Sequence, residues 1–156
     1  MYEPQSVTNL ISELKKLPSI GQKTAERITF FLLKKEKSAV ERFTRAVIEL
    51  KETVSNCRVC NGITDKNPCN ICEDVRRDQS IICVVENPYD MFAIERAGDY
   101  KGRYYVLLGV ISPLDGIGPE DLKINNLLDK IRQNAVREVI LATNPTMQGE
   151  ATAIYI

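Results

Sequence analysis

The sequence predicts an α/β protein that carries an all-α unit at its N-terminus. Three observations predict this fold class. Apolar residues recur at helical spacing through residues 1–55, four cysteines gather in residues 56–78, and β-branched runs alternate with helical patterns through residues 79–156. Such alternation is typical of a mostly parallel sheet with helices on both faces.

Composition limits the classes of function that the chain can have. Its 156 residues are 44% hydrophobic and 27% charged, with a net charge of zero, which is enough for one core and a small accessory module. Residues 1–56 hold 10 Lys and Arg against 7 Asp and Glu, so the N-terminal part of the chain is mildly basic. Because the sequence contains no histidine, we exclude histidine acid–base catalysis and histidine-ligated metals.

The sequence predicts no membrane segment. It has no apolar run near the roughly 18 residues that cross a bilayer, and "MYEPQSVTNLISELKK" lacks the basic-then-apolar order of a signal peptide. We expect a cytoplasmic protein.

Three helices are predicted in residues 1–55. Apolar residues at helical spacing indicate a first helix over residues 5–17, which a Pro-containing turn ends. A second helix is expected from Gln22 to Lys35, and Ser38 with Glu41 forms a possible capping box for a third. The second helix is expected to bury three apolar residues: Ile28, Phe31 and Leu32.

The turn in "LPSIGQKTAERI" is a candidate phosphate-binding site. Gly21 permits a tight turn with open backbone amides, and the helix that follows directs its N–H donors and positive dipole toward an anion. Lys23 and Arg27 lie four residues apart on one face of that helix. A plain interhelical turn with solvated basic residues is an equal alternative. Ser19 takes a place that favours glycine, so it either avoids a positive φ or accepts strain.

Four cysteines form the strongest local pattern. Cys57 and Cys60 make one C-x-x-C pair, and Cys69 and Cys72 make another. Two such pairs can hold one Zn²⁺ tetrahedrally, with no open position for catalysis, so the spacing favours one structural zinc ion per chain. A dithiol redox pair and disulfides are the alternatives, and Cys83 is expected to be a buried strand thiol.

The last part of the chain alternates between strands and helices. We expect strands over residues 80–86, 103–110 and 137–143, and helices over residues 88–98, 119–131 and from 149 onward. The final helix has no stop signal, which predicts a C-terminally truncated chain.

Several stretches resemble the RecR family of bacterial recombination mediators: "CRVCNGITDKNPCNICEDVRRD", "ICVVENPYDMFAIE", "LDGIGPEDL" and "ATNPTMQGEATA". The resemblance implies a helix-hairpin-helix DNA-binding unit in residues 1–55, a four-cysteine zinc finger in residues 56–78 and an incomplete Toprim domain in residues 79–156. It further implies a dimeric or tetrameric ring on double-stranded and gapped DNA. There the protein would act with RecO and RecF to load recombinase during DNA repair, associated with the nucleoid.

The Toprim resemblance predicts that the chain is not an enzyme. Catalytic Toprim relatives hold Mg²⁺ with a glutamate and two aspartates. Glu86 matches that glutamate, but against the "TDPDREGEA" of type IA topoisomerases Asn144 and Thr146 replace both aspartates. An amide and a hydroxyl add no charge to offset dehydration of the ion. We expect Glu86, Asn144 and Glu150 to contribute to a pocket for a basic partner, with RecO as the candidate. Capping of helix N-termini is the alternative for the two carboxylates.

Two other functions stay open on the sequence alone. One is a metal-dependent Toprim nuclease or topoisomerase fragment. The other is a zinc-stabilised scaffold that serves only self-association.

Overall fold

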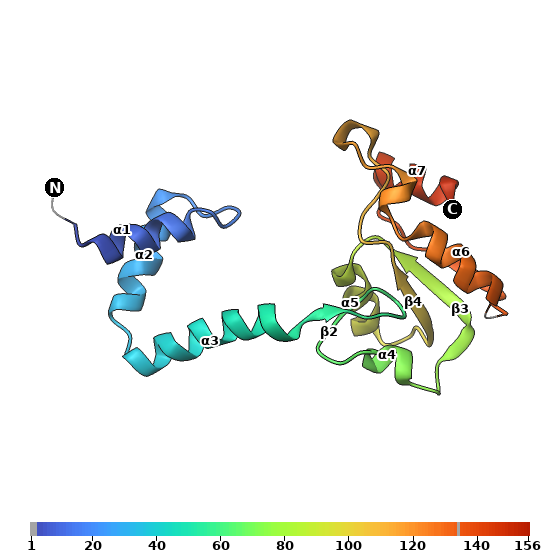
Figure 1. The fold of residues 1–156 in the computed structure, drawn as a ribbon, viewed down its shortest axis with the longest axis horizontal. Helices are drawn as coiled ribbons and strands as arrows, with labels where there is room; N and C mark the ends of the chain where they lie inside the picture. Colours follow the sequence, from blue (N-terminus) through green and yellow to red (C-terminus); the bar gives the residue numbers. More distant parts are fainter. Residues whose placement is uncertain (1–2, 134) are drawn as a thin grey trace. The chain divides into compact units, whose positions relative to one another are not determined.

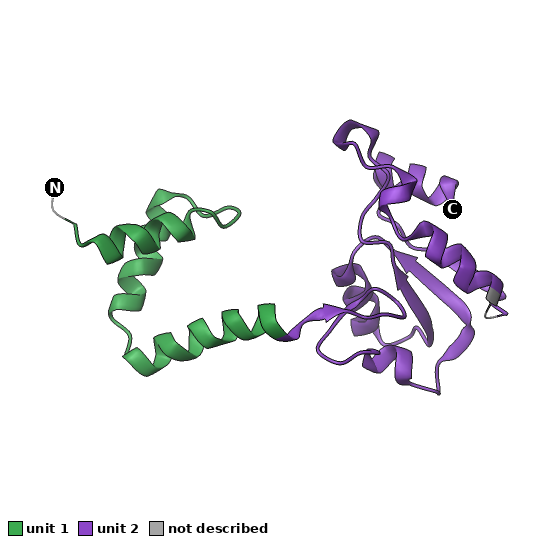
Figure 2. Ribbon diagram, in the orientation of Figure 1, with its two compact units in different colours: residues 1–52 green, residues 53–156 purple. Residues whose placement is uncertain are grey.

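The computed structural model describes residues 3–133 and 135–156. The chain divides into two compact units, Met1–Glu52 and Thr53–Ile156 (Figure 2). The first unit is helical. The second holds both the four cysteines and the α/β segment, whose elements follow one another along the chain in Figure 1.

The helical unit consists of α1 (Gln5–Leu14), α2 (Gln22–Leu33) and α3 (Lys37–Thr53). Its small interior is formed by Ile11 of α1 with Ala25 and Thr29 of α2, which are all buried. The first helix ends three residues earlier than predicted. The third begins one residue before Ser38, so the predicted capping box does not mark its start.

The apolar residues of this unit are more exposed than predicted. Ile28 and Leu32 are half-buried, but Phe31 is 57% exposed, so its predicted burial is wrong for this chain. In α3 no described residue is buried, and Phe43, Val47 and Leu50 all lie more than half exposed. The helices were predicted correctly from their periodicity, but three helices of this size do not cover all the apolar surface that they carry.

The second unit is built on a three-stranded parallel sheet in the order β4-β3-β5. The central strand β3 (Asp78–Val85) pairs with β4 (Gly102–Val106) and with β5 (Glu138–Leu141), both in the parallel sense. In this register Cys83 lies between Tyr104 and Ile140. The prediction of a mostly parallel sheet is confirmed.

Helices cover both faces of the sheet, as predicted. Ile82 and Val84 of β3 face one side and pack against Leu127 of α6 (Ile124–Gln133). Cys83 and Val85 face the other side and pack against Met91 of α5 (Pro88–Ala97). The period-2 alternation of a strand therefore divides the core into two clusters, one on each side.

Element boundaries in the second unit differ from the sequence prediction, most clearly after β4 and before α6. The strand expected to run to residue 110 ends at Val106, because the backbone turns at Leu108 and Gly109, which both have positive φ (66° and 155°). The helix expected over residues 119–131 is split into a short 3-10 turn, η2 (Pro119–Asp121), and α6. Among the described helices, none is both long and apolar enough to cross a membrane.

Candidate metal centre and candidate nucleic-acid interface

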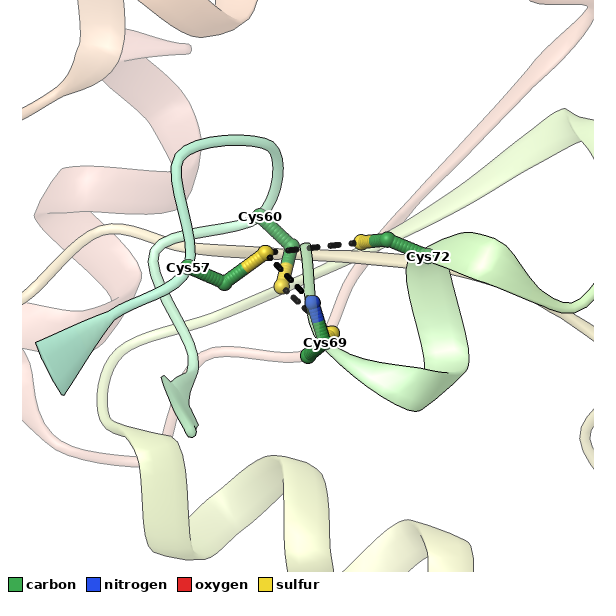
Figure 3. A group of neighbouring side chains, drawn as sticks. All are labelled: Cys57, Cys60, Cys69 and Cys72. Carbon is green, nitrogen blue, oxygen red and sulfur yellow. Dashed lines mark hydrogen bonds between the residues drawn. The ribbon is translucent and has the colours of Figure 1, made fainter. Parts of the chain in front are cut away.

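The four cysteines lie on a small module that precedes the sheet. Strands β1 (Ser55–Asn56) and β2 (Ile63–Thr64) form an antiparallel pair around the first C-x-x-C turn. The second C-x-x-C opens the short helix α4 (Asn70–Glu73), with Cys69 at its N-cap. Figure 3 shows the four side chains of Cys57, Cys60, Cys69 and Cys72 converging from these two turns.

The sulfur geometry fits one tetrahedral zinc ion. All four Sγ atoms lie within 4.8 Å of one another. The Sγ atoms of Cys57 and Cys72 are 3.9 Å apart and those of Cys60 and Cys69 are 3.7 Å apart. Zn–S bonds of about 2.3 Å give tetrahedral S···S edges of about 3.8 Å, whereas a disulfide requires about 2.05 Å. The predicted zinc ligands thus form a single structural zinc site, and the disulfide alternative does not match these distances.

Backbone amides stabilise the sulfurs as acceptors. The N–H groups of Val59 and Cys69 donate to the Sγ of Cys57 at 3.4 and 3.3 Å, and the N–H of Gly62 donates to the Sγ of Cys60 at 3.4 Å. Hydrogen bonds to a charged acceptor favour its ionised form. The first C-x-x-C turn, which carries both acceptor sulfurs, is therefore shaped to hold thiolates rather than neutral thiols.

Burial and mutual contact shift the pKa values of three of the clustered thiols, those of Cys60, Cys69 and Cys72. Contact with the Cys72 thiol lowers the pKa of Cys60 to about 5. The same contact, followed by burial, raises the pKa of Cys72, and burial raises the pKa of Cys69 to about 11. The cluster thus accepts one thiolate readily, at Cys60, whereas ionisation of Cys69 and Cys72 is opposed. A divalent cation removes that opposition and cross-links the two turns.

The metal module is joined to the sheet by hydrogen bonds. The N–H of Val106 donates to the carbonyl of Cys60 at 2.7 Å, and the side-chain amide of Asn61 donates back to the carbonyl of Val106 at 3.0 Å. Lys130 of α6 donates to the carbonyl of Val59. These contacts explain why the module and the sheet fall into one compact unit.

A second attachment lies just after the module. Arg77 forms a two-pronged ion pair with Glu95 of α5, with N···O distances of 2.9 and 2.5 Å, and it also donates to the carbonyl of Gly102. The hydroxyl of Tyr104 donates to the same carboxylate at 2.7 Å. Arg77, Glu95 and Lys130 were not predicted from the sequence, because a lone charged residue carries no sequence signal of its distant partner.

The predicted phosphate-binding residues lie at the N-cap and in the first half of α2. Gly21 is its N-cap, with an extended backbone (φ −88°, ψ 176°), and it is Ser19 that takes the left-handed conformation of the turn (φ 63°). Of the two alternatives for Ser19, the structure has the strained one. A Cβ on Gly21 would meet nothing within 4 Å, so the approach to the first N–H groups of α2 is open. Lys23 and Arg27 are exposed on successive turns of the same helix.

Glu86 and Asn144 are joined by two hydrogen bonds. Glu86 follows β3 and is only 5% exposed. One of its carboxylate oxygens accepts from the backbone N–H of Asn144 at 2.8 Å and the other accepts from the Asn144 side-chain amide at 2.7 Å. Gly149 fits closely against them, since a Cβ there would lie 2.1 Å from the Asn144 carbonyl oxygen and 2.6 Å from Glu86 Oε1. This role of Gly149 was not predicted from the sequence.

Thr146 and Glu150 have different surroundings. Thr146 is the N-cap of α7 (Met147–Tyr155), and its Oγ1 accepts from the N–H of Gly149 at 3.0 Å. This helix therefore starts two residues before the predicted position. Glu150 lies in its first turn and is exposed. Of the three predicted partner-binding residues, the structure thus joins Glu86 to Asn144 and leaves the Glu150 side chain facing solvent.

Comparison with known families gives three matches in consecutive parts of the chain. Residues 7–51 match the family model of the RecR helix-hairpin-helix, and residues 54–74 match that of the RecR four-cysteine zinc finger domain. Residues 80–156 match the Toprim domain. The first match contains the exposed basic face of α2, the second contains all four sulfur ligands, and the third contains Glu86, Asn144 and Glu150.

Proposed function

The chain belongs to the RecR family, and on that basis we propose that it is a non-enzymatic mediator that binds DNA through α2 and assists recombinase loading at gapped DNA. Family membership supports a role in recombinational DNA repair. The finer steps, namely DNA contact by particular residues, cooperation with RecO and RecF and absence of catalysis, belong to the proposal. So does its action in the cytoplasm at the nucleoid.

One observation carries the DNA-binding part of the proposal. Gly21, Lys23 and Arg27 combine on one short helical segment an open N-terminus with two exposed cations. Helix N-termini and basic side chains both favour phosphate oxygens. Phosphate contacts of this kind carry no base information, so the proposed binding has no sequence preference.

The Glu86 loop supports a non-enzymatic role for the Toprim domain. In a metal-dependent Toprim enzyme the carboxylate at this position would be a ligand of Mg²⁺. Here both of its oxygens accept hydrogen bonds from Asn144, and Thr146 is engaged as a helix cap. The residues at the two aspartate positions therefore do not supply the anionic oxygens that Mg²⁺ requires.

The partner-binding part of the proposal falls on the surface around this loop. Glu86, Asn144 and Glu150 are its candidate residues, with RecO as the candidate partner. Glu150 is exposed and negatively charged, so it is available to a basic side chain. Glu86 acts indirectly in this proposal, because it fixes the backbone of Asn144, which precedes α7.

Self-association is a second proposed property, and the exposed apolar face of the helical unit favours it. A groove of about 380 Å³ between α2 and α3 is lined by Ile28, Phe31, Leu32, Ala39, Val40 and Phe43, with Lys35 at its edge. A contiguous apolar surface of this kind is typical of an interaction site. We assign it to a second copy of the chain, as ring formation in a dimer or tetramer would require. Light scattering should give a multiple of the 17.6 kDa chain mass, and a strictly monomeric mass at high concentration would contradict the assignment.

The DNA-binding proposal is tested with a matched pair of double variants. Lys23→Ala with Arg27→Ala should weaken binding to labelled duplexes of unrelated sequence by the same factor. Arg42→Ala with Arg45→Ala removes the same charge from exposed positions of α3 in the same unit, and it should have much the smaller effect. Equal losses in both variants would mean that only net charge matters and that α2 is not the binding site.

A further inference from the structure

The solvent-facing side of α2 carries an aromatic residue among its cations. Lys23, Arg27 and Lys34 occur at positions i, i+4 and i+11, and Phe30 lies at i+7. At about 100° per residue, these four positions fall within roughly 60° of one another around the helix. They form one stripe, which lies opposite the side that buries Ala25 and Thr29.

The stripe borders a groove that is open to solvent. The groove has a volume of about 830 Å³, and Lys23, Thr24, Arg27, Phe30, Phe31 and Lys34 are among its lining residues. Phe30 is 54% exposed. The one carboxylate in the lining, Glu26, accepts a hydrogen bond from Gln22 at 2.6 Å. The groove therefore presents three cations and two aromatic rings, of which Phe30 belongs to the stripe.

This combination suits a nucleic acid strand better than an apolar protein surface. Covering Phe30 with an apolar partner would also desolvate the neighbouring cations, which is costly unless they are paired. A DNA strand supplies both kinds of partner, since its phosphates pair with cations and its bases have aromatic faces. From Lys23 to Lys34 the helix rises about 16 Å, which is long enough to follow several nucleotides.

We propose that Phe30 stacks on an unpaired base of a DNA strand whose phosphates contact Lys23, Arg27 and Lys34. The inference rests on the proposed DNA-binding function and specifies the class of DNA that the α2 site prefers. Bases in a continuous duplex are stacked on one another and do not offer a free face to a helix that lies along the backbone. The ring therefore adds affinity only where a strand is single or interrupted, as at a gap.

A tryptophan at this position provides a direct readout. The chain has no tryptophan, so Phe30→Trp would be the only source of indole fluorescence. Titration with a short oligothymidylate should quench and shift that emission, whereas a blunt duplex of equal length should change it little. Tyr89→Trp is the matched control, because Tyr89 is similarly exposed (62%) but lies on α5 in the second unit, outside both the stripe and the self-association groove. Its emission should respond to neither DNA.

Affinity measurements complete the test. Phe30→Ala should weaken oligothymidylate binding about fivefold or more, leave duplex binding nearly unchanged and keep the salt dependence of the parent. Lys34→Ala should weaken binding to both DNAs and reduce the salt dependence. Thermal unfolding monitors the fold of each variant, and Phe30 is exposed enough that its removal should leave the melting temperature unchanged.

The possible outcomes separate this inference from the function on which it rests. If Phe30→Ala binds single strands as the parent does, while the Lys23 and Arg27 double variant loses binding, base stacking is refuted and the DNA site stands. If neither change affects binding, both are refuted. If Phe30→Ala alters only the mass found by light scattering, Phe30 belongs to an interface between copies and the inference is wrong.

Discussion

Replacing Cys57 by alanine should release the zinc ion and unfold the module that contains it. Within residues 54–77 only Cys57, Cys60, Gly62 and Cys69 are buried. The module therefore has no apolar core that could replace the metal. Structural zinc sites contribute about 10–16 kcal/mol at neutral pH, whereas the net stability of a whole domain is about 5–15 kcal/mol. The free energy of metal binding that is lost with one of the four ligands should therefore exceed the stabilisation that the rest of the module provides.

Cys83→Ala is the matched control for this prediction. Cys83 is also a buried thiol (3% exposed), but it packs in the core of the sheet and is not among the clustered sulfurs. Removing its sulfur should leave a small cavity that costs about 1 kcal/mol, or about 4–8 °C in melting temperature for a unit of this size. Its zinc content should stay at one ion per chain.

The assay combines metal analysis with thermal unfolding of freshly purified, reduced protein. We expect one zinc ion per chain in the parent and in Cys83→Ala, and almost none in Cys57→Ala. The melting temperature of Cys57→Ala should fall by more than that of the control. A Cys57→Ala protein that melts like its parent would refute the reasoning, as would a parent that contains no zinc.

Three other predictions concern separate parts of the chain. Ser19→Gly should stabilise the helical unit by about 1 kcal/mol, because it relieves a positive φ, whereas Ala46→Gly in the middle of α3 should destabilise it by a similar amount; urea midpoints that move the other way would contradict this. Burial disfavours the Glu95 carboxylate, yet Arg77 and Tyr104 outweigh burial and keep its pKa below the usual value. This ion pair should therefore stabilise the protein above about pH 4.3 and cease to do so as the pH falls through the lowered pKa. In Arg77→Met the melting temperature should fall less steeply with decreasing pH in this range, and a fall as steep as that of the parent would count against the ion pair. Supercoiled DNA should stay intact with Mg²⁺ or Mn²⁺, and nicking that Glu86→Ala abolishes would show that the chain is an enzyme.

The parts of the fold that could be predicted depend on local patterns. The two C-x-x-C pairs identify the metal ligands without any knowledge of the fold, because four thiols at that spacing have few other arrangements. The alternation of strands and helices likewise predicts a parallel sheet, which the pairing of β3 with β4 and β5 confirms. Periodicity also identifies α2 and α3.

The parts that could not be predicted depend on contacts distant in sequence. Periodicity indicates that Phe31 belongs to an apolar face, but not whether another element covers that face, and in this chain it is 57% exposed. The hydrogen bonds between Glu86 and Asn144 join residues 58 positions apart. Once they are seen, the need for a side-chain-free residue at Gly149 becomes clear. A glycine in the first turn of a predicted helix was the signal available in the sequence.

The salt dependence of duplex binding tests the central proposal most directly. If Lys23 and Arg27 each neutralise one phosphate, replacing both by alanine should reduce the slope of log Kobs against log salt by about 1.8. The Arg42→Ala and Arg45→Ala variant should keep the parent slope, and the zinc content of both variants should be that of the parent. A double variant of Lys23 and Arg27 with the affinity and slope of the parent would contradict the assignment of DNA binding to α2.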